Sequence, residues 1–276
     1  MPEIARKCAA DPRSSEELVE AHRKDLHSGE DTREAIGILH FRGGRNEFEL
    51  GRQLTESENP EDRAIGADIL AQLGREEQTF QDASVAILIN LLNDPDHHVI
   101  HCAAISLGHR NDERAIPPLV ELAAHEDPLV RFGVTFGLSC HDDQRAVDAL
   151  IKLCRDADRD TRNWAMFALA SQTDMDGMDI RDALALGLED AEHEIRGEAL
   201  VGLARRKDPR TFPALLEEWR AGEISALSIE AAEELADPNL IPYLKELHGS
   251  LDCADDQSFL ESIMRALEAC EGASGE

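Results

Sequence analysis

The sequence predicts an all-α fold, a right-handed α-solenoid of about seven to eight stacked helical pairs. The first indication is a repeated position, here called the arginine slot, that holds Ile100, Arg131, Arg162 and Arg196 at intervals of 31, 31 and 34 residues. A fixed period of this size with helical apolar spacing is typical of stacked helical repeats. The second indication is composition, since 42% of the residues are hydrophobic but only 4% are aromatic. Small apolar side chains suit close helix packing rather than a sheet core.

Each repeat places the same residue types at fixed distances from the arginine slot. Leu lies 12 residues before the slot and 7 after it, and Asp lies 12 after it, in all four units. We expect these Asp residues to cap the first helix of the next pair, because a carboxylate there accepts otherwise unpaired backbone N–H groups. The predicted caps are Asp112, Asp143, Asp174 and Asp208. Six residues after the slot lies a small residue, such as Gly202, which would let a neighbouring helix approach closely.

The slot arginines and the acid six residues before each slot are expected to form a structural ladder between successive units. A planar guanidinium group can bind a carboxylate through two parallel N–H groups, which suits a rigid link. The predicted ladder consists of Arg131, Arg162, Arg196, Asp94, Asp156 and Asp190. His125 replaces the acid in one unit, and Ile100 replaces the arginine in another. This interpretation assigns the arginines to stability rather than to catalysis.

The whole chain, residues 1–276, is predicted to form a single domain. Residues 1–57 form irregular N-terminal units, residues 58–249 the regular repeats, residues 250–271 a C-terminal cap and residues 272–276 a disordered tail. The first helix begins with Ser14 and Glu17, whose spacing is that of a capping box. The last predicted helix, residues 258–269, has one apolar face that can cover the final repeat.

Between these ends the helices follow from the apolar period and from the Gly, Pro and Asp residues that interrupt it. Helices are expected at about 14–26 and 32–39, then in a pair over 46–73 with Pro60 in its turn. The regular pairs are 79–93 with 97–108, 113–125 with 129–140, 144–156 with 160–171, 179–189 with 193–205, and 210–221 with 224–236. A further helix is expected at 240–248.

The charge of the chain excludes several classes of partner. Acidic residues outnumber Lys and Arg by 57 to 28, and the net charge is −29. A nucleic acid or an anionic membrane surface would be repelled, whereas a basic protein partner would be attracted. Six cysteines without a Cys-x-x-Cys pair indicate reduced thiols, and no export signal or apolar membrane span is visible. We therefore expect a cytoplasmic protein, a monomer that binds no nucleic acid and no membrane.

One cluster of residues could in principle hold a metal ion. His97, His98, His101 and Cys102 gather at the start of one predicted helix, and His97 and His101 share a face because they are four residues apart. However, there is no His-Glu-x-x-His motif, and a third ligand would have to come from Asp94, Asp96 or a neighbouring turn. We expect a hydrated helix start, with no metal and no cofactor. No nucleophile motif is present either, so no catalytic residues and no enzymatic activity are predicted.

Trp164 is the candidate anchor of a protein-binding face. It lies two residues after the slot, where the other units have Cys102, Gly133 and Glu198. The second helices are expected to line the concave face of such a stack, and an exposed Trp in a groove is a typical binding anchor. The predicted protein-binding residues are Trp164, Asn163, Glu198 and Arg205. The alternative, in which the indole packs onto neighbouring helices, is left open by the sequence.

The repeated pattern, a Leu-rich first helix, an Asp turn, a Val-Arg-x-x-Ala second helix and a Leu-Gly ending, resembles HEAT repeats of the bilin-lyase-like subtype across nearly the whole chain. More narrowly, several segments resemble YibA-type HEAT proteins. They are Phe41-Arg42-Gly43-Gly44, Arg162-Asn163-Trp164-Ala165-x-Phe167-Ala168, Ile180-Arg181-Asp182, Arg196-x-Glu198-Ala199-x-x-Gly202-Leu203 and Glu230-Ala231-Ala232. Proteins of that group occur beside Rhs toxins and are regarded as immunity proteins.

The resemblance implies a non-enzymatic scaffold that binds a basic protein, such as a toxin domain, on an acidic concave face. The alternative function is a bilin-lyase-like or other small-ligand enzyme that uses the groove as a pocket. A DNA-repair glycosylase built from HEAT-like repeats is a third class, but it needs a basic groove, which a net charge of −29 disfavours.

Overall fold

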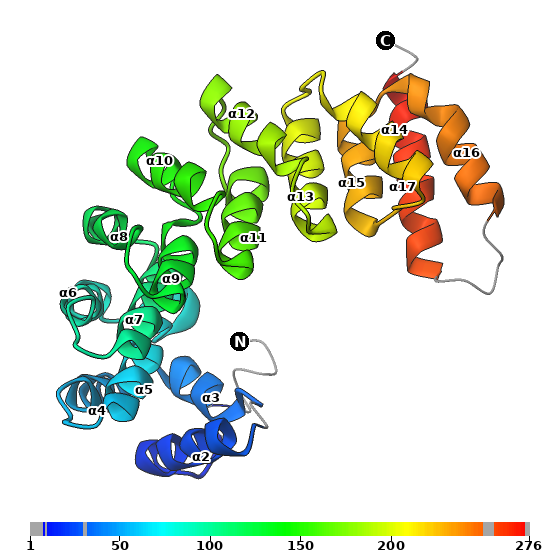
Figure 1. The fold of residues 1–276 in the computed structure, drawn as a ribbon. Coiled ribbons are helices and arrows are strands. Elements are labelled where there is room, and N and C mark those ends of the chain that lie inside the picture. The colour runs from blue at the N-terminus through cyan, green and yellow to red at the C-terminus, as the bar shows by residue number, and fades with distance from the viewer. Residues whose placement is uncertain (1–7, 9, 30–31, 251–256, 274–276) are drawn as a thin grey trace. The chain divides into compact units, whose positions relative to one another are not determined.

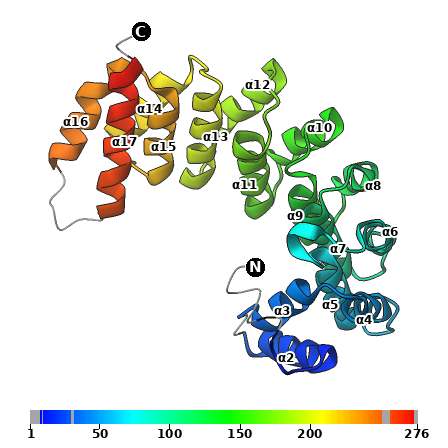
Figure 2. The same ribbon diagram turned by 180° about the vertical axis from the view of Figure 1, so that it is seen from behind.

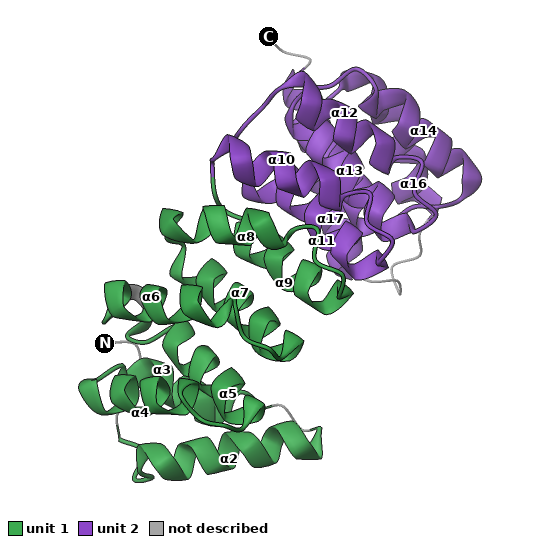
Figure 3. Cartoon of the chain, turned by 60° about the vertical axis from the view of Figure 1, so that its left-hand side comes forward, with its two compact units in different colours: residues 1–141 green, residues 142–276 purple. Residues whose placement is uncertain are grey.

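The computed structural model describes residues 8, 10–29, 32–250 and 257–273, and every regular element among them is a helix. The predicted all-α solenoid of paired helices is confirmed, with eight pairs in the described residues. The chain, predicted as one domain, divides into two compact units, Met1–His141 and Asp142–Glu276 (Figure 3). Each unit is described here by itself.

Unit 1 contains four helical pairs, and their second helices α5, α7 and α9 pack against one another in sequence order (Figure 1). The pairs are α2 (Ser15–Ser28) with α3 (Glu34–Arg42), α4 (Arg45–Thr55) with α5 (Pro60–Ala71), α6 (Gln81–Leu91) with α7 (His97–Arg110), and α8 (Ile116–Leu122) with α9 (Pro128–Leu138). Short 3₁₀ turns lie at Arg75–Glu77 and Glu113–Ala115. The capping box predicted for the first helix is present, since Ser14 and Glu17 each bind the other's backbone N–H.

Unit 2 also contains four pairs. They are α10 (Gln144–Leu153) with α11 (Arg159–Phe167), α12 (Met178–Gly187) with α13 (His193–Arg205), α14 (Thr211–Ala221) with α15 (Ala226–Leu235), and α16 (Ile241–Ser250) with α17 (Gln257–Ala273). A π-helical turn, η3 (Ala168–Gln172), extends α11, and a 3₁₀ turn lies at Pro238–Leu240. The second helices α13, α15 and α17 lie side by side in both views of the ribbon (Figure 2).

The core of each unit follows the apolar period read from the sequence. Val130, Val134 and Leu138, one side of α9, are fully buried. The close approach expected six residues after the slot is present at Gly202, where a Cβ atom would lie 2.7 Å from a Leu184 methyl group and 2.9 Å from the Ala170 Cα. Such a distance leaves no room for a side chain, so this glycine allows the neighbouring elements to touch.

Only one of the four predicted caps lies at the start of a first helix. Asp143 is the N-cap of α10, whereas Asp112 caps the short 3₁₀ turn that precedes α8. Asp208 accepts a hydrogen bond from the backbone N–H of Arg210, but the N-cap position of α14 is Arg210 itself. Asp174 does not cap a helix, because α12 begins four residues later, at Met178, after Gly177. This repeat is 34 residues long rather than 31, and the preceding helix ends in the π-helical turn, so the cap position is displaced.

One boundary near the end of the chain differs from the prediction. The closing helix α17 continues through Ala273, so residues 272 and 273 of the predicted tail are helical. Residues 274–276 lie outside the described part of the chain. Helix ends are the least predictable positions in a sequence, because the last turn has few hydrogen bonds to define it.

Candidate protein-binding face

Arg162 shows how the ladder residues lie in the structure. Its Nε donates to Asp190 Oδ2 at 2.9 Å, and its Nη1 donates to the main-chain carbonyl of Asp156 at 2.9 Å. Asp190 in turn accepts the backbone N–H of Glu192 at 3.0 Å. The guanidinium group therefore connects the turn of its own pair with the turn of the next pair. In this contact Asp156 supplies a carbonyl oxygen, whereas the carboxylate comes from the following repeat.

The other slot arginines repeat the contact with their own turns. Arg131 Nη1 donates to the carbonyls of His125 and Glu126, at 2.8 and 3.0 Å. Arg196 binds Glu218 at 2.8 Å and also pairs with Glu223. For Arg196 the carboxylates thus come from the next pair, but from α14 and the residues after it rather than from the turn that Asp190 occupies.

Sequence reasoning missed one member of this set. Arg63 binds Asp94 through two hydrogen bonds of 2.7 Å and also donates to the carbonyls of Ser57 and Glu58. Arg63 therefore occupies an additional arginine slot in α5. The available signal was Leu70, which lies seven residues after Arg63 as Leu138 lies after Arg131.

The histidine cluster ties α7 to the start of α9. His97 Nδ1 lies 2.8 Å from Asp127 Oδ2, and His101 Nδ1 lies 2.9 Å from the carbonyl oxygen of Leu129. Burial raises the pKa of the Cys102 thiol to about 12, which disfavours the thiolate that a metal ion would need. Within the described residues, no group of three or more His, Cys, Asp or Glu side chains could hold a metal ion.

Trp164 lies on α11 and is half-buried rather than fully exposed. Its ring meets the ring of Phe167 edge to face, with 5.5 Å between the centroids and 87° between the planes. This is a favourable aromatic geometry, and it orients the indole over the next turn of its own helix. The side chain therefore combines partial packing with a surface that water still reaches.

Glu198 occupies the same position of the next repeat, on α13, which packs against α11. Burial, together with the nearby carboxylate of Glu230, raises the pKa of the Glu198 carboxyl to about 7. Glu230 lies two residues after the slot of α15, which holds Ser228. The pKa of Glu230 is itself raised by burial and by Glu234, while Arg205 opposes the shift. Glu230 was not among the predicted site residues, although its spacing from Ser228 could have identified it.

Asn163 and Arg205 lie on the same two helices. Asn163 is half-buried, and its side-chain oxygen is buried without a hydrogen-bond partner. Arg205 is exposed, and its Nη1 makes only long contacts, of 3.5 and 3.4 Å, with the carbonyls of Ala170 and Ser171. Contacts of this length are weak, so the guanidinium group keeps much of its freedom.

A hollow of about 440 Å³ lies between α15 and α17. Its lining includes the acids Glu230, Glu233 and Glu234 and the ring of Phe259. Arg265 closes one side and pairs with Glu233 at 3.4 Å. We use the name second-helix face for Asn163, Trp164, Glu198, Arg205 and Glu230 together with this hollow. Aromatic rings and carboxyl groups are the side chains that recognise cations.

The paired helices, stacked through their second helices and linked by arginines, define the class of protein as a helical-repeat scaffold. The family model for HEAT repeats matches residues 49–139, 85–170 and 116–186. Protein YibA of Escherichia coli (strain K12) is 32% identical over 238 residues, which cover 84% of this chain and 83% of YibA.

The solved structures agree with the sequence relationship. The X-ray structure of Escherichia coli YibA superposes with a TM-score of 0.69 and 29% identity, over 96% of this chain and 95% of YibA. An engineered protein of known structure superposes with a TM-score of 0.56 and 19% identity, over 93% of this chain and 78% of that protein, and shows the shared fold alone. The chain belongs to the HEAT-repeat family and is a homologue of YibA. Among its described residues, no helix has the length and apolarity needed to cross a membrane.

Proposed function

We propose that this protein is a non-enzymatic scaffold that binds a basic protein partner through the second-helix face, as a cytoplasmic monomer. The observation that carries the proposal is the pair of carboxyl groups, Glu198 and Glu230, brought together on adjacent helices beside the repeat that holds Trp164. Placing two like charges near each other in a partly buried site is unfavourable. A Lys or Arg side chain bound between them would relieve that repulsion, so the arrangement favours a cationic partner.

The resemblance to YibA-type proteins suggests which partner this is. We propose that the basic partner is a cognate toxin domain and that binding neutralises it. An acidic surface suits this role, because electrostatic attraction accelerates the encounter of oppositely charged proteins. The side-chain oxygen of Asn163, buried without a partner, offers an additional acceptor for a donor group on the bound protein.

The test begins with capture of the partner at low salt from a lysate of the source organism, followed by measurement of its binding kinetics with purified protein. We expect the association rate to fall as salt rises, because the screening length shrinks from about 10 Å at 0.1 M to about 3 Å at 1 M. Trp164→Ala should weaken binding by about 2 kcal/mol, and this loss should appear as a faster dissociation rate. Glu198→Lys should mainly slow association at low salt.

Two control variants are available in this chain. Tyr243→Ala removes an exposed aromatic side chain on α16, and Glu121→Lys reverses an exposed acid on α8. Both should bind like the unmodified protein. A salt-independent association rate together with normal binding by Trp164→Ala would contradict the proposal. Recovery of a coloured or other small-molecule ligand in place of a protein would instead favour a bilin-lyase-like or other small-ligand enzyme.

A further inference from the structure

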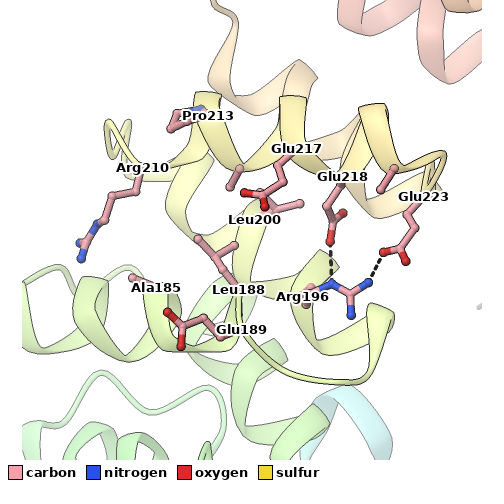
Figure 4. A pocket seen from close by; sticks show the side chains of 12 residues that line it. Ala185, Leu188, Glu189, Arg196, Leu200, Arg210, Pro213, Glu217, Glu218 and Glu223 are labelled. Carbon is pink, nitrogen blue, oxygen red and sulfur yellow. Dashed lines mark hydrogen bonds and ion pairs between the residues drawn. The ribbon is translucent and has the colours of Figure 1, made fainter.

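A second hollow in unit 2 is formed mainly by the first helices of two pairs and does not involve the second-helix face. It lies between α12 and α14, beside the start of α13, and has a volume of about 830 Å³. This volume is comparable with that of pockets that enclose drug-sized molecules or several side chains. Figure 4 shows the hollow with the side chains that line it.

The floor of the hollow is apolar. Leu200 of α13 is fully buried, and Leu188, just after α12, is half-buried. Ala185, Ala214 and Pro213 also line the hollow. Because these side chains are short or branched, they leave a depression in which another aliphatic chain could displace water.

The rim of the hollow is acidic, and its two cations are already bound. Arg196 is held by Glu218 at 2.8 Å and by Glu223, both of which line the hollow (Figure 4). Arg210 is held by Asp208 at 2.8 Å and by Asp182 at 2.8 Å. Each guanidinium group therefore has its own carboxylate partners within unit 2.

Two carboxylates at the rim have no cationic partner among the described residues. Glu189 and Glu217 line the hollow and are exposed, and neither makes an ion pair or a hydrogen bond through its side chain with any described residue. In Figure 4, Glu217 comes from α14 and Glu189 from the turn that follows α12, and Leu188 lies between them in this view. The hollow thus combines an apolar floor with two carboxylates that have no cation.

We propose that the hollow between α12 and α14 is a docking site for a basic segment of a partner protein. A Lys or Arg side chain of that segment lies with its aliphatic stem on Leu188 and Leu200. Its charged group lies between Glu189 and Glu217. Long cationic side chains bind in this way, because the stem is apolar while the head group is charged. A second copy of this chain is not the occupant, because two chains that each carry a net charge of −29 repel one another.

The site can be tested with defined peptides rather than with an unknown partner. The probe is a short peptide of alternating lysine and leucine, and its counterpart has glutamate in place of lysine. Binding is followed by titration calorimetry and by methyl NMR of the intact protein. We expect the lysine peptide to bind and to shift the methyl signals of Leu188 and Leu200, and the glutamate peptide not to bind.

Variants distinguish this hollow from general attraction to an acidic protein. Glu189→Gln with Glu217→Gln should weaken the affinity at least about tenfold, and Ala221→Trp should weaken it by filling the hollow. The matched control, Glu121→Gln with Glu268→Gln, removes two exposed charges elsewhere and should change the affinity less than about twofold. Trp164→Ala should have no effect, so this proposal and the second-helix face can fail separately. Equal weakening by the control pair, or methyl shifts confined to the second-helix face, would overturn the proposal.

Discussion

Glu198 shows at the scale of one residue how an acidic protein can carry a carboxyl group that is only partly ionised. Most of the acids among the described residues face water or an arginine, whereas Glu198 is partly buried beside Glu230, and its pKa is raised to about 7. Its pKa in the unfolded chain is near the ordinary value of 4.5. The folded protein therefore holds this proton more tightly than the unfolded chain does. The resulting stabilisation is present at low pH and is lost as the pH rises from about 4.5 through about 7.

This difference predicts the effect of Glu198→Gln. The variant cannot ionise at this position, so it should gain stability relative to the unmodified protein as the pH rises from about 5 to 8. The full shift would correspond to about 3 kcal/mol, and we expect about 1 to 2 kcal/mol because water partly screens the group. Urea denaturation at several pH values measures the difference. Glu268→Gln, an exposed acid on α17, is the control; a difference that does not change with pH would contradict the assignment.

Arg162 makes a second prediction at this scale. Arg162→Ala should lower the free energy of unfolding by about 1 to 3 kcal/mol, because the largely buried Asp190 and the carbonyl of Asp156 lose their donors. Arg159→Ala is the matched control on the same helix, since its partners are about half exposed and it should cost less than about 1 kcal/mol. Equal losses of unfolding free energy in the two variants would show that Arg162 does not link the repeats.

At the scale of the element, each helical pair depends on its neighbour to cover its apolar side. In the last described pair, α17 contributes its own apolar face to the core. Ile263, Ala266 and Cys270 are buried against a core cluster that includes Ile229 and Leu244 of the preceding helices. A terminal helix with one apolar and one polar face is the usual way to end a stack of repeats.

Deletion of the chain from Ser258 onward should therefore expose Ile229 and Leu244 to water. Light scattering and sedimentation should show association, and the melting temperature should fall, because a new apolar patch is created at the end of the stack. Deletion of residues 274–276 alone leaves α17 in place and serves as the control. A shortened protein that is monomeric and equally stable would mean that α17 does not act as a cap.

At the scale of the whole molecule, the dominant property is the net charge of −29. Such a charge keeps copies of the protein apart and attracts basic partners. Within one folded chain, however, the negative groups also repel one another. The ion pairs between arginines and acids of successive repeats reduce this repulsion locally. They cannot remove it, since acidic residues outnumber basic residues by 57 to 28.

Added salt should therefore stabilise the isolated protein while it weakens partner binding. Raising the ionic strength from about 0.01 to 0.15 M shortens the screening length from about 30 to 8 Å, and we expect the melting temperature to rise by several degrees. Scanning calorimetry in NaCl and in KCl measures the effect. If the melting temperature rises equally in NaCl and KCl, the rise is due to screening of the charges. A fall in melting temperature would show that attractive ion pairs outweigh the repulsion.

The sequence by itself determined the helices, their pairing and some of their caps. These features depend on residues that are close together in the chain, such as Asp143 capping the helix that follows it, so spacing alone predicts them. The repeat period also predicted the stacking of the second helices. Where the spacing changed, as in the 34-residue unit, the local rule failed and Asp174 was wrongly assigned as a cap.

Only the tertiary structure decided which groups meet across repeats. Arg162 receives its carboxylate from Asp190, 28 residues away. Glu198 acquires its raised pKa from burial and from Glu230 on another helix. Trp164 is half-buried, a point that the sequence had left open. These outcomes depend on the rotation and separation of neighbouring helices and on side-chain rotamers, none of which the period encodes, since residues at one repeated position can meet different neighbours in each repeat.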